Sequence, residues 1–164
     1  MKPGKQSLKV TSPGEVLELA ISAEMDAHQF YLRAADQVRD PKARTTFLAL
    51  AGDEEGHRLQ LEAQYRHLME DRKFSYRAGT NILHRHLDQE LEELGVIALG
   101  IKAEKDAMAF YQESGKTAKD PNLKKILLSF VGFEDSHRKL LEAEYQARLG
   151  HPWDDLELDL WVRE

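Results

Sequence analysis

The chain has no cysteine among its 164 residues. That absence excludes disulfides, iron–sulfur clusters, thiol catalysis and any metal site held by cysteine, including a rubredoxin-type iron. Proline (5) and glycine (10) are few, the alternating pattern of strands is missing, and no apolar run approaches the roughly 18 residues of a membrane span. These absences predict a helical protein that does not enter a membrane.

The chain also lacks an excess of positive charge. Its 23 Lys and Arg stand against 29 Asp and Glu, a net charge of −6. That balance argues against nucleic acid as a partner and against a cationic membrane-binding face. The first residues, MKPGKQSLKV, have no apolar segment typical of a secretory signal. With 41% hydrophobic residues, we expect one globular domain over residues 1–164 in a cytoplasmic protein.

An internal repeat with an offset of 80 residues runs through the sequence without a gap. The matching segments are ISAEMDAHQFY (21–31) with IKAEKDAMAFY (101–111), Asp-Pro at 40–41 with Asp-Pro at 120–121, and GDEEGHRLQLEAQY (52–65) with GFEDSHRKLLEAEY (132–145). Each half therefore predicts a helix, a tight Asp-Pro turn and a second helix, which is an αα-hairpin.

The helix assignments rest on apolar residues that recur with a period near 3.6. Ser12 before Pro13 and Pro41 in a first turn are typical helix starts, and Gly150 followed by His-Pro is a typical end. The predicted helices span about 12–38, 42–70, 88–116 and 121–149.

The connection at 71–87 shows no clear period. Its roughly 17 residues can reach about 55 Å when extended, and helices of this length span about 40 Å. The connection can therefore run the length of a bundle and set the third helix parallel to the second. We expect an all-α four-helix bundle of two hairpins with one long crossover, the bundle covering about 12–149. A hairpin-swapped dimer would use the same segment differently, and both arrangements stay open.

Several residues lie outside this core pattern. The tail 150–164 is expected to cover a bundle end or a partner subunit through its large apolar residues, which are Trp153, Leu156, Leu158, Leu160 and Trp161. His84 and His86 in the connection are expected to be solvated. Packing is favoured for Tyr65 and Tyr145. His28, matched by Met108 in the repeat, is expected to fill the core, with a lesser expectation of contact with a bound metal.

Six ionisable residues fall on the apolar stripes, in the middle of the helices. Each half contributes one Glu from its first helix and a Glu-x-x-His from its second, and residues three apart share a helix face. An unpaired buried carboxylate costs several kcal/mol or binds a proton, and four that face one another also repel. Two divalent cations resolve this conflict, with two neutral imidazoles completing the ligand set. The six residues are Glu24, Glu54, His57, Glu104, Glu134 and His137.

The alternative is a solvated or hydrogen-bonded polar layer. A single Glu-x-x-His is weak evidence, because exposed charged residues match it by chance. Here it occurs twice at the repeat offset, each time with a Glu thirty residues upstream. That recurrence favours the metal site, because the pattern is the one found in di-iron and di-manganese carboxylate bundles.

Tyr31 and Tyr111 each lie two turns after their Glu on the same face. One interpretation is core packing. The other is a phenol that donates to a ligand carboxylate, or passes a proton or an electron to bound oxygen species, which would make both tyrosines catalytic.

The segments AEMDAHQFY…DEEGH and AEKDAMAFY…FEDSH resemble the rubrerythrin branch of the ferritin-like superfamily, over about residues 15–147. The resemblance implies a ferritin-like bundle with a dinuclear iron centre. Glu54 and Glu134 would bridge the metals. The terminal ligands would be Glu24 with His57 and Glu104 with His137, and Tyr31 and Tyr111 match tyrosines that hydrogen-bond the centre in that family.

Two departures from that family stand out. Typical rubrerythrins append a cysteine-rich rubredoxin domain, which a chain without cysteine cannot form, so reductase activity needs an external donor such as a rubredoxin or a reductase. They also carry a further Glu three residues after the ligand of the third helix, where this chain has Ala107, and its repeat partner is Ala27. The resulting ligand set of four Glu and two His is closer to bacterioferritin-like centres.

The leading hypothesis is a non-haem di-iron oxidoreductase, a homodimer in which two Fe(II) ions react with H2O2 or O2 in detoxification or in iron oxidation. The alternatives are iron storage, a manganese catalase-like di-manganese enzyme, and a bundle that uses metal for stability alone. Manganese is possible at such a site, and zinc is expected as a substitute in recombinant protein.

Overall fold

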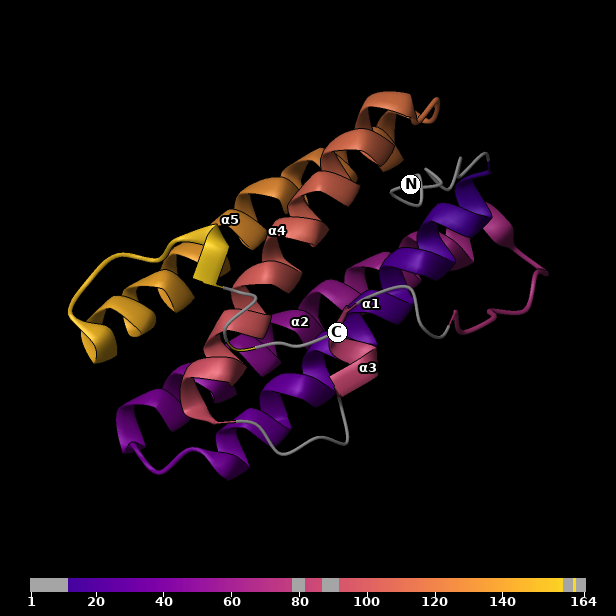
Figure 1. Ribbon diagram of the computed structural model, residues 1–164. Coiled ribbons are helices and arrows are strands. Elements are labelled where there is room, and N and C mark those ends of the chain that lie inside the picture. Colours follow the sequence, from indigo (N-terminus) through magenta and orange to yellow (C-terminus); the bar gives the residue numbers. More distant parts are fainter. Residues whose placement is uncertain (1–11, 78–81, 87–91, 158–160, 162–164) are drawn as a thin grey trace, which may run out of the picture.

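The computed structural model describes residues 12–77, 82–86, 92–157 and 161. Within them lie four long helices, a short helix α3 and a 3-10 turn at Asp155–Glu157 (Figure 1). The long helices are α1 (Pro13–Gln37), α2 (Pro41–Met69), α4 (Glu93–Thr117) and α5 (Pro121–Leu149), with α3 at Ile82–His86. No strand occurs in this part of the chain. The predicted all-α bundle is confirmed.

The repeat seen in the sequence is reproduced in the helix bounds. The first helices of the two halves have 25 residues each and the second helices have 29 each. Both hairpins are closed in the same way: Asp40 and Asp120 each accept a hydrogen bond from a backbone N–H of the first helical turn, and each is followed by proline. An aspartate cap with proline at the first helical position stops one helix and starts the next.

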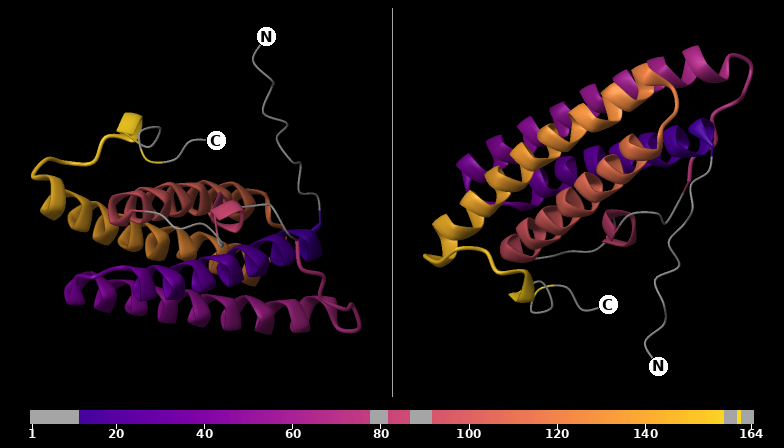
Figure 2. Two further views of the ribbon diagram at one scale, coloured as in Figure 1. Left: turned by 60° about the horizontal axis from the view of Figure 1, so that its bottom comes forward. Right: turned by 90° about the horizontal axis from the view of Figure 1, so that it is seen from above.

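Two layers make up the bundle, one per hairpin (Figure 2). α1 packs along α2 and α4 packs along α5, while contacts between α1 and α4 and between α2 and α5 join the layers. The connection brings the chain back across the bundle, so that α4 runs parallel to α2, as the length of the connection predicts (Figure 1).

The third long helix begins later than predicted. Glu92 has an extended backbone and precedes α4, so the helix starts at Glu93 and the predicted start at residue 88 is wrong. Residues 88–91 lie outside the described part of the chain. Ile82 and Leu83, near the end of the connection, belong to the separate helix α3, so the apolar residues there do not continue into α4.

A row of polar residues on α1 holds the segment that follows α2. Glu18, Ser22 and Asp26 lie four residues apart on one face and are all buried. Arg77 donates to Glu18 (2.9 Å) and, through its backbone N–H, to Ser22 Oγ (2.8 Å), and the Tyr76 hydroxyl donates to Asp26. These contacts fix the path of the connection before α3, which lies against α1 and α4.

His86 is buried, so the prediction that it is solvated is wrong, because α3 folds against the bundle instead of crossing solvent. The side chain of His84 lies outside what the structure describes. In the tail, Trp153 stacks edge-on against Tyr145 and Trp161 donates to the Tyr145 hydroxyl (3.0 Å), so both tryptophans cover that part of the bundle. Leu156 is 81% exposed, and residues 158 and 160 are not described.

None of the helices in the described ranges has the length and the hydropathy needed to cross a membrane.

Candidate metal centre

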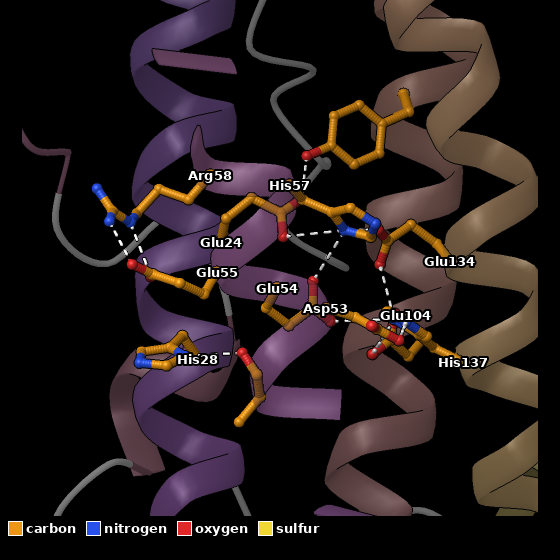
Figure 3. Close-up of polar contacts among 12 residues, drawn as sticks. Glu24, His28, Asp53, Glu54, Glu55, His57, Arg58, Glu104, Glu134 and His137 are labelled. Atoms are coloured by element: carbon orange, nitrogen blue, oxygen red, sulfur yellow. Dashed lines mark hydrogen bonds and ion pairs between the residues drawn. The ribbon is translucent and has the colours of Figure 1, made fainter. Parts of the chain in front are cut away.

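All six ionisable residues predicted from the repeat meet at the centre of the bundle (Figure 3). Each is at most 8% exposed. Each of the four long helices contributes to the site. α1 and α4 give a single glutamate each, and α2 and α5 give a glutamate and a histidine one turn apart. The residues are Glu24, Glu54, His57, Glu104, Glu134 and His137. Their role as ligands stays a prediction.

Two groups of four ligand atoms can be distinguished, each with all atoms within 4.8 Å of one another. The first joins Glu24 and His57 with Glu54 and Glu134, and the second joins Glu104 and His137 with the same two glutamates. Since Glu54 and Glu134 belong to both groups, the arrangement has the form of two adjacent cation positions with two shared carboxylates.

Both histidines direct Nδ1 toward the carboxylates. His57 Nδ1 lies 3.1 Å from Glu134 Oε1 and 3.2 Å from Glu54 Oε2. His137 Nδ1 lies 3.1 Å from Glu54 Oε1 and 3.7 Å from Glu104 Oε1. The two rings stack with centroids 5.6 Å apart, and therefore approach the four carboxylates from the same side.

Four carboxylates and two imidazoles lie together in this centre, so each group affects the pKa of the others. Burial, followed by repulsion from the neighbouring glutamates, raises the pKa of Glu54 and Glu134 well above its ordinary value. Burial lowers the imidazole pKa, but hydrogen bonds with the carboxylates outweigh it and raise the pKa to about 12 for His57 and about 9 for His137. Protons therefore supply the positive charge that the four carboxylates demand.

Several buried polar atoms in the centre have no hydrogen-bond partner of good geometry. Four such atoms belong to the six central residues. Buried polar atoms without partners are rare, and each calls for an explanation such as an ion. Oxygen and imidazole nitrogen donors suit iron, manganese and zinc, so the residues present fit a pair of these cations. The four atoms are Glu54 Oε1, Glu104 Oε2, Glu134 Oε1 and His137 Nδ1.

Each tyrosine of the repeat reaches across to the glutamate of the other half. The Tyr31 hydroxyl donates to Glu104 Oε1 (2.5 Å), and the Tyr111 hydroxyl donates to Glu24 Oε1. Burial and the nearby carboxylates raise the pKa of both phenols well above 10, so both keep their protons at neutral pH. This matches the interpretation in which the phenols donate to ligand carboxylates. The catalytic part of that hypothesis stays a prediction.

Replacing Tyr31 or Tyr111 by phenylalanine is expected to lower the free energy of unfolding by about 1.5–3 kcal/mol each, because each hydroxyl bonds a charged acceptor in the core. Urea denaturation of the two variants measures this. Metal content should stay at the parent value, since neither hydroxyl is a predicted ligand. Unchanged stability in both variants would mean that these hydrogen bonds are not made.

Asp53 is a member of the site that the repeat pattern alone did not single out. Its carboxylate lies 3.1 Å from Nε2 of His137, the ring nitrogen that points away from the centre. The residue at the same place in the other half is Phe133, whose ring lies 5.3 Å from that of His57. Among the described residues, no hydrogen bond reaches Nε2 of His57. The two halves of the centre are thus alike in their inner residues and different behind the histidines.

Two neighbours of the site lie outside it. His28 is half-buried and its Nδ1 lies 2.7 Å from the Ala51 carbonyl oxygen, away from both groups of predicted ligands (Figure 3). Glu55, which follows a predicted ligand directly, pairs with Arg58 at the surface. The interpretation that places Glu54 inside and Glu55 toward solvent is confirmed.

Fold and site together define a ferritin-like four-helix bundle with a buried carboxylate–histidine cluster able to hold metal. The model of the Rubrerythrin family matches residues 15–145, and the chain belongs to that family.

Two solved structures share the fold. A hypothetical protein from Pyrococcus furiosus is 24% identical and gives a TM-score of 0.80, over 90% of this chain and 97% of its own. An uncharacterized conserved protein from Magnetospirillum magnetotacticum is 21% identical and gives a TM-score of 0.64, over 83% of this chain and 95% of its own. No curated protein matches the chain. At these identities the two structures show the fold alone.

Proposed function

We propose that the chain is a di-iron oxidoreductase whose metal pair is held by the six central residues. The observation that carries the proposal is the sharing of Glu54 and Glu134 between the two groups of ligand atoms. In this assignment Glu24 and His57 complete one metal position, and Glu104 and His137 complete the other. Four carboxylates neutralise two divalent cations, which removes the repulsion that the buried cluster otherwise suffers.

When bound as Fe(II), the pair supplies electrons for the reduction of O2 or H2O2. The protein's own residues prepare the site for that reaction. Tyr31 and Tyr111 hold protons on their hydroxyls next to Glu104 and Glu24, where a reacting oxygen species would need them. The six central residues are at most 8% exposed, and this burial strengthens the electrostatic interactions at the centre.

The oxidant is established by mixing the anaerobic Fe(II)-loaded protein with O2 and, separately, with H2O2, and following the oxidation of iron by absorbance. We expect one of the two oxidants to oxidise the protein-bound Fe(II) faster than it oxidises free Fe(II) in buffer. Absence of oxidation by either oxidant would contradict the redox function. Metal analysis of protein purified without added metal separates iron from manganese, and gel filtration separates the predicted homodimer from a storage cage.

Catalytic turnover also requires a supply of electrons. Because no cysteine is present to hold a rubredoxin-type iron in this chain, we propose that an external donor, such as a rubredoxin or a reductase, reduces the centre. Repeated cycles of peroxide consumption in the presence of a reduced donor, and none in its absence, are the expected result.

Metal binding near pH 7 is expected to release protons, because in the metal-free protein the pKa values of Glu54, Glu134, His57 and His137 are all raised. Protons compete with the cation for these groups, so affinity should increase as the pH rises. Titration with Mn(II) in two buffers of different ionisation enthalpy measures the release. Equal heats in the two buffers would contradict this prediction.

A further inference from the structure

A cavity of about 200 Å³ opens between α1, α4 and α3 and reaches the candidate centre. All four central glutamates line it, as does Tyr111, but neither histidine does. The cavity therefore meets the centre on its carboxylate side, whereas the histidines approach from α2 and α5. A molecule in the cavity would contact the part of the centre that the histidines leave uncovered.

The walls of this cavity are apolar and small. Two alanines from α1 face two alanines from α4, and these pairs are related by the 80-residue repeat. Leu19 and Phe110 extend the walls, and Ile82 and Leu83 of α3 cover one side. Among the described residues, Asp106 is the only charged lining residue away from the centre, and it is exposed at the surface. The four alanines are Ala23, Ala27, Ala103 and Ala107.

The volume exceeds what O2 or H2O2 needs. An apolar protein cavity of about 150 Å³ is enough to bind benzene, and a water molecule occupies about 30 Å³ of liquid. An anion would lose its hydration against the alanine and leucine walls and would be repelled by the carboxylates, and an organic cation would have to compete with the bound metals for those carboxylates. Size and chemistry thus both select an uncharged, mainly apolar molecule.

We propose that this cavity binds a small uncharged organic molecule of about the size of benzene beside the metal centre. Its role as a substrate site rests on the proposed function, whereas binding itself needs only the cavity. The alanines set its capacity: a leucine at Ala107 or Ala27 would extend into the space from one wall.

The test uses the full chain and fluorobenzene as the probe, with the binding followed by fluorine NMR. We expect saturable binding with a dissociation constant of about 1 mM or lower, in keeping with a ligand of this size. Ala107→Leu and Ala27→Leu should each weaken binding at least about tenfold, a loss of about 1.4 kcal/mol. Ala109→Leu is the matched control, because Ala109 lies on the exposed face of the same helix and does not line the cavity.

Loading with Mn(II) separates this proposal from the proposed function. Paramagnetic broadening of the fluorine signal, lost in Ala107→Leu and kept in Ala109→Leu, would place the ligand beside the metals. If Mn(II) binds and fluorobenzene does not, the cavity proposal is overturned while the metal centre stands. Binding of fluorobenzene that is equally strong in all three variants would also overturn it. If fluorobenzene binds with the expected dependence on Ala107 but Mn(II) does not bind, the cavity proposal stands and the metal function fails.

Discussion

Replacing Glu54 and Glu134 together by glutamine is expected to abolish binding of the metal pair. Both carboxylates belong to both groups of ligand atoms, so the double change removes two negative donors from each position. A neutral amide neither balances cationic charge nor bridges two metals as a carboxylate does. Metal analysis after loading and desalting should find two ions per parent chain and none in the variant.

The same double variant is also expected to differ from the parent in how metal changes its unfolding temperature. Burial and the neighbouring glutamates raise the pKa of Glu54 and Glu134 well above its ordinary value, which disfavours their charged form in the metal-free protein, and neutral glutamine has nearly the same shape. The metal-free variant should therefore unfold at close to the parent's temperature. Added metal stabilises a protein by about 2.7 kcal/mol at a hundredfold excess over its Kd, and this gain should vanish in the variant.

Glu55→Gln is the matched control for this experiment. Glu55 follows Glu54 directly but pairs with Arg58 at the surface, so its replacement should leave the metal content at two. A double variant that still binds two ions would show that the ligands are assigned wrongly. Equal loss of metal in Glu55→Gln would show that the effect is not specific to the buried pair.

Replacing Asp53 by alanine is expected to weaken one of the two metal positions by about 10–100-fold and to leave the other unchanged. A carboxylate bonded to the outer nitrogen of a metal-binding histidine orients the ring and raises its basicity, and its loss typically costs affinity of that size. Asp53 has this contact with His137 alone. Stepwise titration of the metal-free protein with Mn(II) resolves the two positions.

The repeat supplies the reciprocal variant. Phe133→Asp places a carboxylate at the position equivalent to Asp53, behind His57. It should increase the metal affinity of the position that contains His57. Phe133 is 48% exposed, so the polar side chain is tolerated there. Asp135→Ala is the control, since Asp135 is also adjacent to a central glutamate but pairs with Arg138. Equal weakening of both positions in Asp53→Ala would contradict the inequivalence of the two halves.

Much of this architecture could be predicted from the sequence, because both the helix period and the repeat are written in it. Glu24 and Glu104 could be identified as members of the central cluster, because each lies on an apolar stripe and they recur with the 80-residue offset. The Asp-Pro turns predicted the helix bounds on either side of each turn to within one residue, because a capping aspartate and a first-turn proline strongly favour the start of a helix.

The features that were missed lie where the two halves differ. Glu18 has Ala98 as its repeat partner, and Asp53 has Phe133, so neither is marked by recurrence. Their partners, Arg77 and His137, are distant in sequence, and only packing shows the contact. A comparison of the halves for buried polar residues without a counterpart was the available signal.

The start of α4 and the burial of His86 could not be derived for a related reason. The connection has no repeat partner within the chain and no helical period, so tertiary contacts decide its structure. α3 is five residues long, too short to be stable alone, and it forms because Leu83 packs into the core.

The most direct test of the account is anomalous diffraction from crystals of the protein loaded anaerobically with Fe(II). Two iron peaks in the bundle are predicted, one bound by Glu24 and His57 and the other by Glu104 and His137, with the carboxylates of Glu54 and Glu134 shared between them. A single peak, or iron bound only at surface carboxylates, would contradict the dinuclear centre.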